Sequence, residues 1–310
     1  MAFIQNAEVS QRSSLPFAVV AASSARRFDI PPLEVISLFE SQGAILFRGF
    51  QIEPSRLLSI TDVFTESYSR DTMRRPNRFG AQFIRSVDPW TKQVDLHSEG
   101  SFTPAWPEVI WFCCVQPAGG KGGETILCDG AELWKQLTAQ AKNYFLEHPI
   151  RYDARVPFTQ NTPGRGRRPW LFNSPGTCNA WLDFDSSVTE FTQIRSAVTE
   201  GRQNGMICFA NHLIIDAADE PQLLRRSLVD GTAIAEEFTD QIRKTSAQLT
   251  FEHKWQKGDL LMLDNRRFLH GRRAFDPKDQ RDVVVVQTAR AAFGYGVTTR
   301  VGLKQPSSAG

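Results

Sequence analysis

Two histidines and one glutamate are the residues of this chain best suited to hold a reactive metal. His97 and Glu99 are two positions apart, and on a β-strand such residues point to the same face. His270 lies just past a predicted strand at 260–263 and could supply a third ligand. Two imidazoles and one carboxylate on one side of a metal leave its other positions open, which is typical of non-haem Fe(II) sites.

The other three histidines have simpler interpretations. His148 precedes a proline at the end of a predicted helix, so we interpret it as a surface cap. His253 stands between two charged residues and is expected to be exposed. His212 could line a pocket, but we interpret it as a structural histidine. A histidine and a glutamate two residues apart also occur on solvated surfaces. Whether His97 and Glu99 are metal ligands therefore has to be judged from the elements around them.

The first third of the chain carries helix and strand signals in alternation. Prolines before residues 33–40 and Gly43 after them bracket an amphipathic helix. Residues 44–47 form a short apolar run that predicts a buried strand, and residues 54–67 predict a second helix. Residues 68–95 are polar and basic, and they predict a long loop with short strands.

The middle of the chain begins with its clearest strand. Residues 109–115 are apolar on both faces and are bounded by prolines, which predicts a strand that is buried on both sides. The glycine-rich residues 119–123 lack a phosphate-binding pattern and predict a turn into a strand at 125–128. Residues 131–146 have the apolar spacing of a helix.

Residues 153–190 break this regularity. They contain several prolines and the basic cluster Arg165, Arg167 and Arg168. Irregular segments of this length inside a compact domain are usually lids, binding loops or insertions, so we predict a lid or substrate loop at 153–190. The basic cluster is interpreted as solvated, and contact with an anionic substrate stays an open alternative.

The last third predicts one helix and three strands. The helix is expected at 230–246, and the strands at 247–251, 259–263 and 283–287, the last of which contains four consecutive valines. No repeat or linker divides the sequence. We therefore predict a single domain over residues 1–310, mainly β with flanking helices, built as either a closed barrel or a two-sheet jelly roll.

Composition and charge narrow the class of protein. The 36 Lys and Arg nearly balance the 34 Asp and Glu, which argues against binding to nucleic acid or to an acidic membrane surface. No stretch reaches the ~18 apolar residues that span a bilayer, and residues 1–14 lack the apolar core of a signal peptide. The five cysteines include no CxxC pair, so we expect free thiols, small core residues at Cys128 and Cys208, and a cytoplasmic location.

Motifs spread over residues 30–290 occur in a characteristic order. They are residues 43–50, 97–102, Pro107, 111–113, 122–125, 129–130, Trp255, 258–259, 264–265, 270–272 and Arg281. Together they resemble the TauD/TfdA-like family, including its clavaminate-synthase-like branch. The resemblance implies a double-stranded β-helix, which is a jelly roll, and an Fe(II)- and 2-oxoglutarate-dependent dioxygenase that also consumes O₂.

The resemblance also implies a role for particular positions. His97, Glu99 and His270 would be the iron ligands, while Arg281 and Thr125 would bind the distal carboxylate of 2-oxoglutarate. A guanidinium matches a carboxylate with two parallel hydrogen bonds, which a lysine cannot do as well. Arg290 is a rival for the arginine role because it lies near the end of the same predicted strand.

The expected reaction is hydroxylation, desaturation or cyclisation of a small molecule. The resemblance implies an amino-acid-derived or other natural-product intermediate, free or tethered to a carrier protein. A non-catalytic metal-binding jelly roll is the main alternative, and Arg281 and Thr125 weigh against it. A zinc hydrolase with the same ligands would need a general base, for which only Glu99 is a candidate. The sequence does not predict the oligomeric state.

Overall fold

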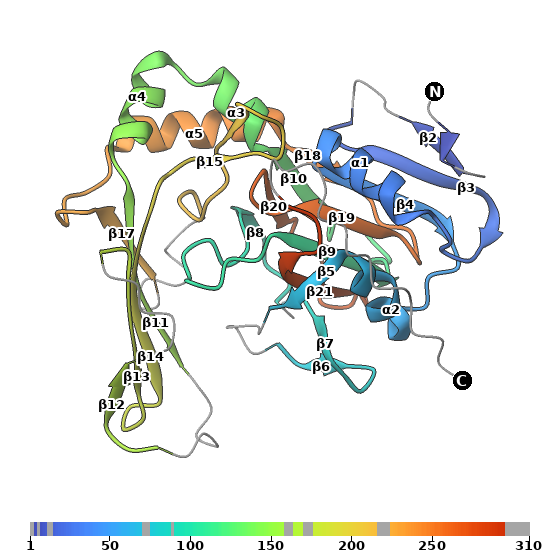
Figure 1. Cartoon of the computed structure of the whole chain (residues 1–310), viewed down its shortest axis with the longest axis horizontal. Helices are drawn as coiled ribbons and strands as arrows, with labels where there is room; N and C mark the ends of the chain where they lie inside the picture. The colour runs from blue at the N-terminus through green and yellow to red at the C-terminus, as the bar shows by residue number, and fades with distance from the viewer. Residues whose placement is uncertain are drawn as a thin grey trace.

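The computed structural model of the chain describes residues 3–4, 7–10, 15–69, 75–87, 90–157, 164–169, 176–215 and 224–294. Strands form most of its regular structure, and helices lie around them (Figure 1). This mainly β architecture with flanking helices is the one that the sequence predicts. Residues 70–74 and 88–89 of the predicted loop at 68–95 lie outside the described residues, as do residues 1–2, 5–6 and 11–14.

A ten-stranded sheet forms one half of the core. Its strands lie in the order β1 (Phe3–Ile4), β2 (Ala7–Ser10), β3 (Ala18–Arg26), β4 (Ala44–Phe50), β19 (Leu260–Asp264), β9 (Val109–Gln116), β21 (Asp282–Ala291), β7 (Ala81–Ser86) and β6 (Asn77–Arg78), and β5 (Thr65–Tyr68) also pairs with β21. The apolar runs predicted at 44–47, 109–115, 259–263 and 283–287 therefore lie side by side at the centre of this sheet.

A smaller sheet faces the large one. It has the order β18 (Phe251–His253), β10 (Thr125–Asp129), β20 (Phe268–Arg272) and β8 (Val94–His97). Leu127 and Phe268 of the small sheet share one buried apolar cluster with Phe112, Leu261 and Val283 of the large sheet. Two sheets packed over a common core make the jelly roll, and the closed-barrel alternative is not adopted.

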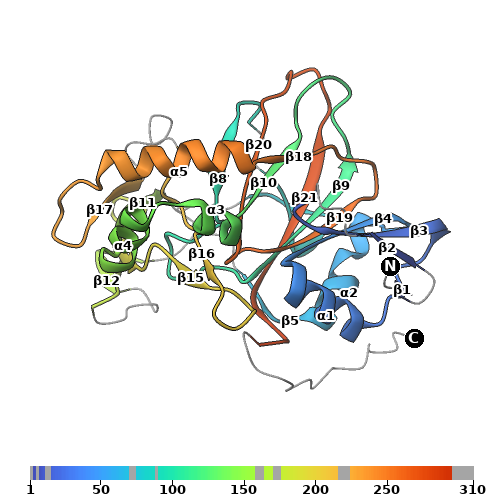
Figure 2. The same ribbon diagram turned by 90° about the horizontal axis from the view of Figure 1, so that it is seen from above.

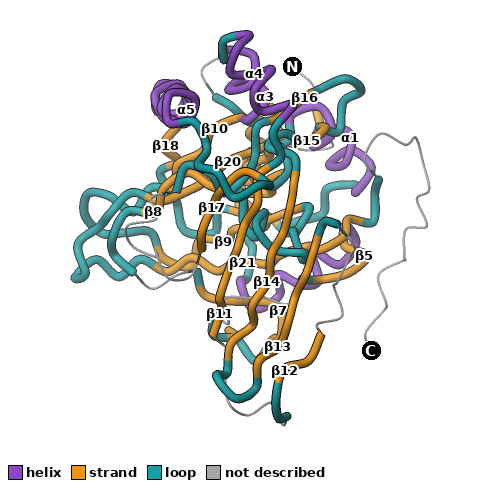
Figure 3. Tube along the Cα trace, turned by 90° about the vertical axis from the view of Figure 1, so that its left-hand side faces the viewer, coloured by secondary structure: helices purple, strands orange, loops and turns teal. Residues whose placement is uncertain are grey.

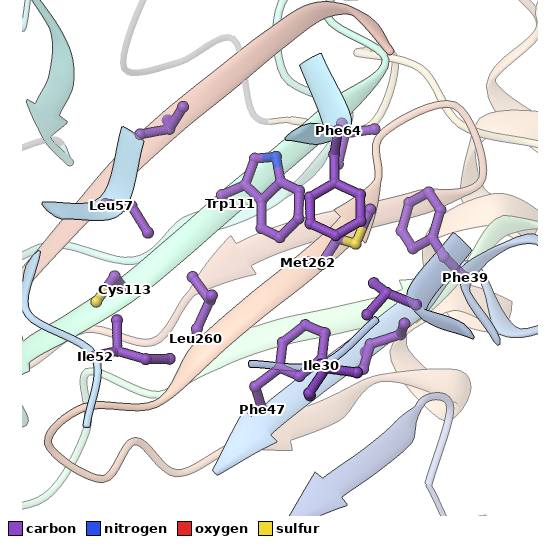
Figure 4. Close-up of a cluster of buried hydrophobic side chains, with 14 of the residues drawn as sticks. Ile30, Phe39, Phe47, Ile52, Leu57, Phe64, Trp111, Cys113, Leu260 and Met262 are labelled. Carbon is purple, nitrogen blue, oxygen red and sulfur yellow. The ribbon is translucent and has the colours of Figure 1, made fainter. Parts of the chain in front are cut away.

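The outer face of the large sheet is buried as well. Helix α1 (Pro32–Gln42) and the short helix α2 (Leu57–Thr61), which is flanked by the 3₁₀ turns η1 (Pro54–Arg56) and η2 (Asp62–Phe64), cover it. Figure 4 shows Phe64 beside Trp111 and Met262, and the ring centroids of Phe64 and Trp111 are 5.4 Å apart. Burial on both sides explains why β9 has no polar face. Cys113 points into this outer cluster and Cys114 into the core between the sheets.

The segment predicted to be a loop at 153–190 contains regular structure. A five-stranded sheet has the order β12 (Arg167–Pro169), β13 (Cys178–Asp183), β14 (Val188–Arg195), β11 (Ile150–Pro157) and β17 (Leu224–Leu228). Its long strands stand apart from the large sheet in Figure 1, and Figure 3 shows β11, β13 and β14 running side by side. The irregular-loop interpretation was wrong here because β14 alternates buried and partly exposed residues, a pattern that the prolines and glycines around it obscure. Residues 158–163 and 170–175 of the predicted segment lie outside the described residues.

Three helix predictions need smaller corrections. Residues 65–67 of the predicted helix 54–67 belong instead to β5, since they pair with β21. The predicted helix 131–146 is two helices, α3 (Gly130–Gln136) and α4 (Ala139–Glu147), because the hydroxyl of Thr138 caps the second by accepting from the backbone N–H of Ala141. Helix α5 (Glu236–Leu249) starts after a turn at Asp230 and extends to Leu249, so β18 begins at Phe251.

Helices α3, α4 and α5 lie together on one side of the molecule (Figure 2). They pack with the small sheet and the five-stranded sheet in a further buried cluster. A two-stranded ribbon of β15 (Thr199–Glu200) and β16 (Ile207–Cys208) adjoins α3. All five cysteines are free and buried, as the sequence predicts. Among the described residues, no helix is long and apolar enough to cross a membrane.

Candidate active site

The two histidines of the predicted triad lie on neighbouring strands. His97 ends β8 and His270 occupies the middle of β20, and the two residues are direct partners in the antiparallel pairing. Their ring centroids are 4.6 Å apart. Gly271 permits this approach, because a Cβ at that position would lie 2.4 Å from the carbonyl oxygen of Val94.

Glu99 reaches the histidines from a turn and not from a strand. β8 ends at His97, and Gly100 has a φ of +65°, so the predicted alternation of strand faces does not apply to Glu99 or Gly100. Asn265 holds the turn instead. Its Oδ1 accepts from the backbone N–H of Glu99 at 2.9 Å, and its Nδ2 donates to the carbonyl oxygen of Glu99 at 2.8 Å.

The side chains of His97, Glu99 and His270 converge. Oε2 of Glu99 lies 3.6 Å from Nε2 of His97 and 3.9 Å from Nε2 of His270. One ligand atom from each residue lies within 4.8 Å of the others. Nδ1 of His97 donates to the carbonyl oxygen of Asp95 at 2.8 Å, which leaves the lone pair of Nε2 for a metal. The donor set fits Fe(II), as the sequence predicts.

Arg75 is a site residue that sequence reasoning missed. Its Nη2 donates to Oε1 of Glu99 at 2.7 Å, and both side chains are largely buried. Burial alone would raise the pKa of Glu99, but Arg75 and the two histidines hold that pKa well below its ordinary value. The only sequence signal was the basic character of residues 68–95, which does not single out Arg75.

A cavity of about 50 Å³ extends from the triad between the two sheets. Its walls include the three triad residues together with Thr125, Arg272 and Arg281. Thr125 and Arg272 are register partners on β10 and β20, and Arg281 directly precedes β21. Burial, and then the charge of Arg272, lower the pKa of Arg281 to about 10. With this pKa, Arg281 stays charged at neutral pH, so this end of the cavity suits an anion.

Arg281 and Thr125 also touch each other. Nε of Arg281 donates to the carbonyl oxygen of Gly123 at 2.7 Å, and its Nη2 lies 3.5 Å from Oγ1 of Thr125. Nε1 of Trp255 donates to the same Oγ1 at 2.9 Å. Because an indole nitrogen can only donate, the threonine hydroxyl accepts there and keeps its own hydrogen for another acceptor. Arg290, by contrast, is exposed and lies 3.4 Å from Glu66, away from the cavity.

The remaining histidines differ partly from their predicted settings. His253 is buried and its Nε2 lies 3.4 Å from Oδ2 of Asp259, so the prediction of an exposed side chain was wrong. His212 is buried, with its ring centroid 5.2 Å from that of His97. His148 follows α4, and its Nδ1 hydrogen-bonds the carbonyl oxygen of Tyr144 at 2.8 Å, as expected for a cap.

Residues 32–287 match the model of a protein family described as taurine catabolism dioxygenase TauD, TfdA family. This match covers most of the chain. The chain belongs to this family. The family, the jelly-roll fold and the class of Fe(II)- and 2-oxoglutarate-dependent dioxygenases that the sequence predicted are thereby confirmed.

Individual relatives agree with the family match. The chain is 27% identical over 284 residues to the dapdiamide synthesis protein DdaC of Enterobacter agglomerans, covering 82% of this chain and 84% of that protein. It is 24% identical over 288 residues to the 3-((Z)-2-isocyanoethenyl)-1H-indole synthase of Fischerella ambigua, covering 89% and 94%. These relatives span nearly the whole chain.

Solved structures show the same fold. PvcB, described as an Fe, alpha-ketoglutarate dependent oxygenase from an isonitrile synthetic pathway, superposes with a TM-score of 0.56 at 15% identity, covering 93% of each chain. A taurine dioxygenase from Burkholderia xenovorans gives a TM-score of 0.59 at 18% identity, covering 91% of this chain and 89% of that one. At this identity the likeness concerns the fold.

Proposed function

We propose that His97, Glu99 and His270 are the iron ligands and that Arg281 and Thr125 bind the distal carboxylate of 2-oxoglutarate. The observation that carries this assignment is the single cavity that joins the triad to Arg281. The chemistry supplied by bound iron is the O₂-dependent oxidation of a substrate C–H bond, coupled to conversion of 2-oxoglutarate to succinate and CO₂.

The protein's own residues then position and shield the reactants. Arg281 offers a fork of N–H donors to a carboxylate, and the hydroxyl of Thr125 has its hydrogen available for the same group because Trp255 occupies its acceptor side. Phe112 packs 5.3 Å from the ring of His270 and closes the apolar side of the cavity. A buried site of this kind excludes water from the reacting groups.

The proposed substrate is an amino-acid-derived or other natural-product intermediate, either free or tethered to a carrier protein. The relatives that make dapdiamide and an isocyanoethenyl indole support this class. We also propose that the chain acts in the cytoplasm, which the five free cysteines support, and that residues 1–310 work as one domain. Within it, residues 153–190 would cover the substrate, since β14 begins in this segment and its next residue, Phe191, packs on Phe102, just past the ligand turn.

The test is a turnover assay with Fe(II), 2-oxoglutarate, O₂ and a panel of candidate substrates. We expect succinate, together with a product 16 mass units heavier or 2 lighter than its substrate, corresponding to hydroxylation or to desaturation and ring closure. The His97→Ala protein serves as the control for adventitious iron chemistry. Metal binding without consumption of 2-oxoglutarate under any condition would favour the non-catalytic jelly roll.

A further inference from the structure

A second hollow lies beside the ligand turn, on the side of the five-stranded sheet. It has a volume of about 450 Å³, and its walls include Pro104, Trp106, Thr177, Gln193, Arg195 and Val198. None of these residues borders the cavity that joins the triad to Arg281. The hollow therefore has walls of its own, formed by the chain just after Glu99 and by β13 and β14, and it adjoins the ligand turn at Trp106.

Arg195 is the charged group of this hollow. It stands on the same face of β14 as Phe191 and Gln193, because residues two and four apart on a strand point the same way. Phe191 stacks on Phe102 with ring centroids 6.2 Å apart, so this face is turned towards the ligand turn. The guanidinium of Arg195 lies 5.0 Å from the ring centroid of Trp106.

The hydrogen bonds of Arg195 leave most of its donors unused. Nη2 donates to the carbonyl oxygen of Thr103 at 2.7 Å, whereas Nε is buried without an acceptor within the described ranges. None of the carboxylates in those ranges pairs with it. Burial, and then the charge of nearby Arg266, lower its pKa to about 10, so it remains a cation at neutral pH. Arg195 is partly buried, and a guanidinium whose Nε is buried without an acceptor is favoured by a ligand that supplies an anion.

Trp106 connects this hollow to the metal ligands. Its Nε1 donates to Oγ of Ser98 at 2.8 Å, and Ser98 is the residue between His97 and Glu99. Ser98 in turn donates to the carbonyl oxygen of Asn265 at 2.6 Å. A ligand that contacts Trp106 would therefore touch a side chain that is hydrogen-bonded directly to the turn carrying Glu99.

Gln193 adds a neutral polar group. Its Nε2 donates to the carbonyl oxygens of Thr177 and Ile194, each at 2.9 Å, so the group that remains for a ligand is its own carbonyl oxygen. Arg266 also lies over the Trp106 ring, at 5.4 Å, but it is paired with Glu108 at 3.4 Å, so Arg195 is the cation left for a ligand. One available cation and one acceptor match a singly charged acid that carries an N–H group nearby. A phosphate dianion would call for more positive charge than Arg195 provides here.

We infer that the hollow between Trp106 and Arg195 binds a carboxylate of the substrate, at the end remote from the carbon that is oxidised. Arg195, held over the ring of Trp106, donates to the carboxylate, and Gln193 accepts from an amide N–H. This inference rests on the proposed function and narrows its substrate class to acids of the N-acyl amino-acid type.

The test measures binding without turnover. Protein loaded with Mn(II) and N-oxalylglycine, so that the Arg281 cavity is filled, is titrated calorimetrically with N-acetyl-phenylalanine, its neutral carboxamide and inorganic phosphate. We expect the acid to bind at least about tenfold more tightly than the carboxamide, and Arg195→Gln to raise its Kd by about tenfold or more. Arg195→Lys should recover part of the loss. Trp106→Leu should also weaken binding of the acid.

The matched control is Arg155→Gln on neighbouring β11, where an exposed arginine pairs with Glu190 at 3.0 Å. This variant should leave binding of the acid unchanged. Equal binding of acid and carboxamide, or an unchanged Kd in Arg195→Gln, would overturn the inference. Phosphate binding as tight as that of the acid would make the hollow a general anion site and overturn the carboxylate assignment. Loss of N-oxalylglycine binding in the wild type would instead refute the proposed function.

Discussion

The two oxygens of the Glu99 carboxylate have different partners: Oε1 accepts from Nη2 of Arg75 at 2.7 Å, while Oε2 faces Nε2 of His97 at 3.6 Å. Arg75 therefore fixes which oxygen is available to a metal. If Glu99 ligates iron as we propose, a carboxylate held in this way would coordinate through one oxygen only. The positions that a second oxygen would occupy would then stay open for 2-oxoglutarate and O₂.

Removal of this ion pair should impair the site without removing a ligand. In Arg75→Met, Glu99 loses both its orientation and the positive charge that lowers its pKa. We expect Fe(II) affinity to fall by roughly 10–100-fold, the range typical for partners that orient metal ligands. Arg151→Met is the control, since it breaks an arginine–carboxylate pair of 2.9 Å on the five-stranded sheet. Equal Fe(II) affinity in wild type and Arg75→Met would show that Glu99 is oriented by its turn alone.

Loss of either histidine should abolish metal binding while the fold survives. His97→Ala or His270→Ala removes one of the three proposed ligands, and the apolar clusters on either side of the large sheet are built from other side chains, of which Phe112 packs on His270. We expect no stoichiometric Fe(II) binding, no succinate and a nearly unchanged circular dichroism spectrum. His148→Ala, which removes a helix-capping imidazole, should retain full activity. Substantial succinate formation by both ligand variants would exclude the assignment.

The proposed binding of 2-oxoglutarate by Arg281, and not by Arg290, can be tested by substitution of each arginine. Arg281→Lys keeps a positive charge but loses the fork of donors, so the KM for 2-oxoglutarate should rise by an amount equivalent to about 1.5–3 kcal/mol. Arg290→Lys should change nothing, because Arg290 is exposed and paired only with Glu66. A raised KM in Arg290→Lys together with a normal KM in Arg281→Lys would reverse the assignment.

The sequence predicted elements well where local pattern and burial agree. Residues 109–115 and 283–287 are apolar on both faces because the large sheet is covered on both sides. They could therefore be recognised as buried strands without knowledge of the strands that pair with them. Residues 153–190 failed for the opposite reason. The alternation of β14 is obscured by the prolines and glycines around it, and although β13 is its neighbour in sequence, its other partner, β11, is separated from it by a long intervening segment.

In the active site, too, residues with a recognisable local pattern were predicted, and a contact between separate segments was not. His97, Glu99 and His270 could be proposed from residue type and from the family resemblance. Glu99, however, reaches the two histidines from a turn held by Asn265 and not from a strand. Arg75 could not be proposed, because its pairing with Glu99 arises from a contact between separate segments and from no local pattern. His253 was misjudged because its charged neighbours face outward while its ring turns towards Asp259.

An ion pair between a buried aspartate and a partly exposed arginine should matter for stability. Asp259 is buried, and Nη2 of Arg48 donates to its Oδ2 at 2.6 Å. Asp259→Asn leaves Arg48 without its anion, so we expect a loss of about 3 kcal/mol in the free energy of unfolding at pH 7. Urea denaturation measures it, with Asp153→Asn in the exposed pair with Arg151 as the control.

The pH dependence of this loss follows from the pKa of Asp259. Burial alone would raise that pKa, but hydrogen bonds from Arg48 and His253 hold it below its ordinary value of 3.8. The ionised carboxylate therefore stabilises the fold fully above pH 3.8, and this contribution disappears as pH falls through the lower pKa of the folded state. The difference between wild type and Asp259→Asn should shrink between pH 7 and pH 3. A difference that stays constant over this range would mean that the carboxylate's charge contributes nothing.

The position of Glu99 also predicts which atom is transferred to the substrate. A halogenating enzyme of this fold would need a small residue in place of the carboxylate, so that chloride could take its coordination position. Here Oε2 of Glu99 already points at both histidines, and Gly100 lies in the turn beyond it, so neither residue vacates that position. We therefore expect hydroxylated, desaturated or cyclised product and no chlorinated product, even in molar NaCl. Mass spectrometry of wild-type reactions with and without chloride tests this. Glu99→Ala in the same buffers is the informative comparison, because only that variant offers chloride a place beside the two histidines. A chlorinated product from the wild type would mean that Glu99 is not a ligand.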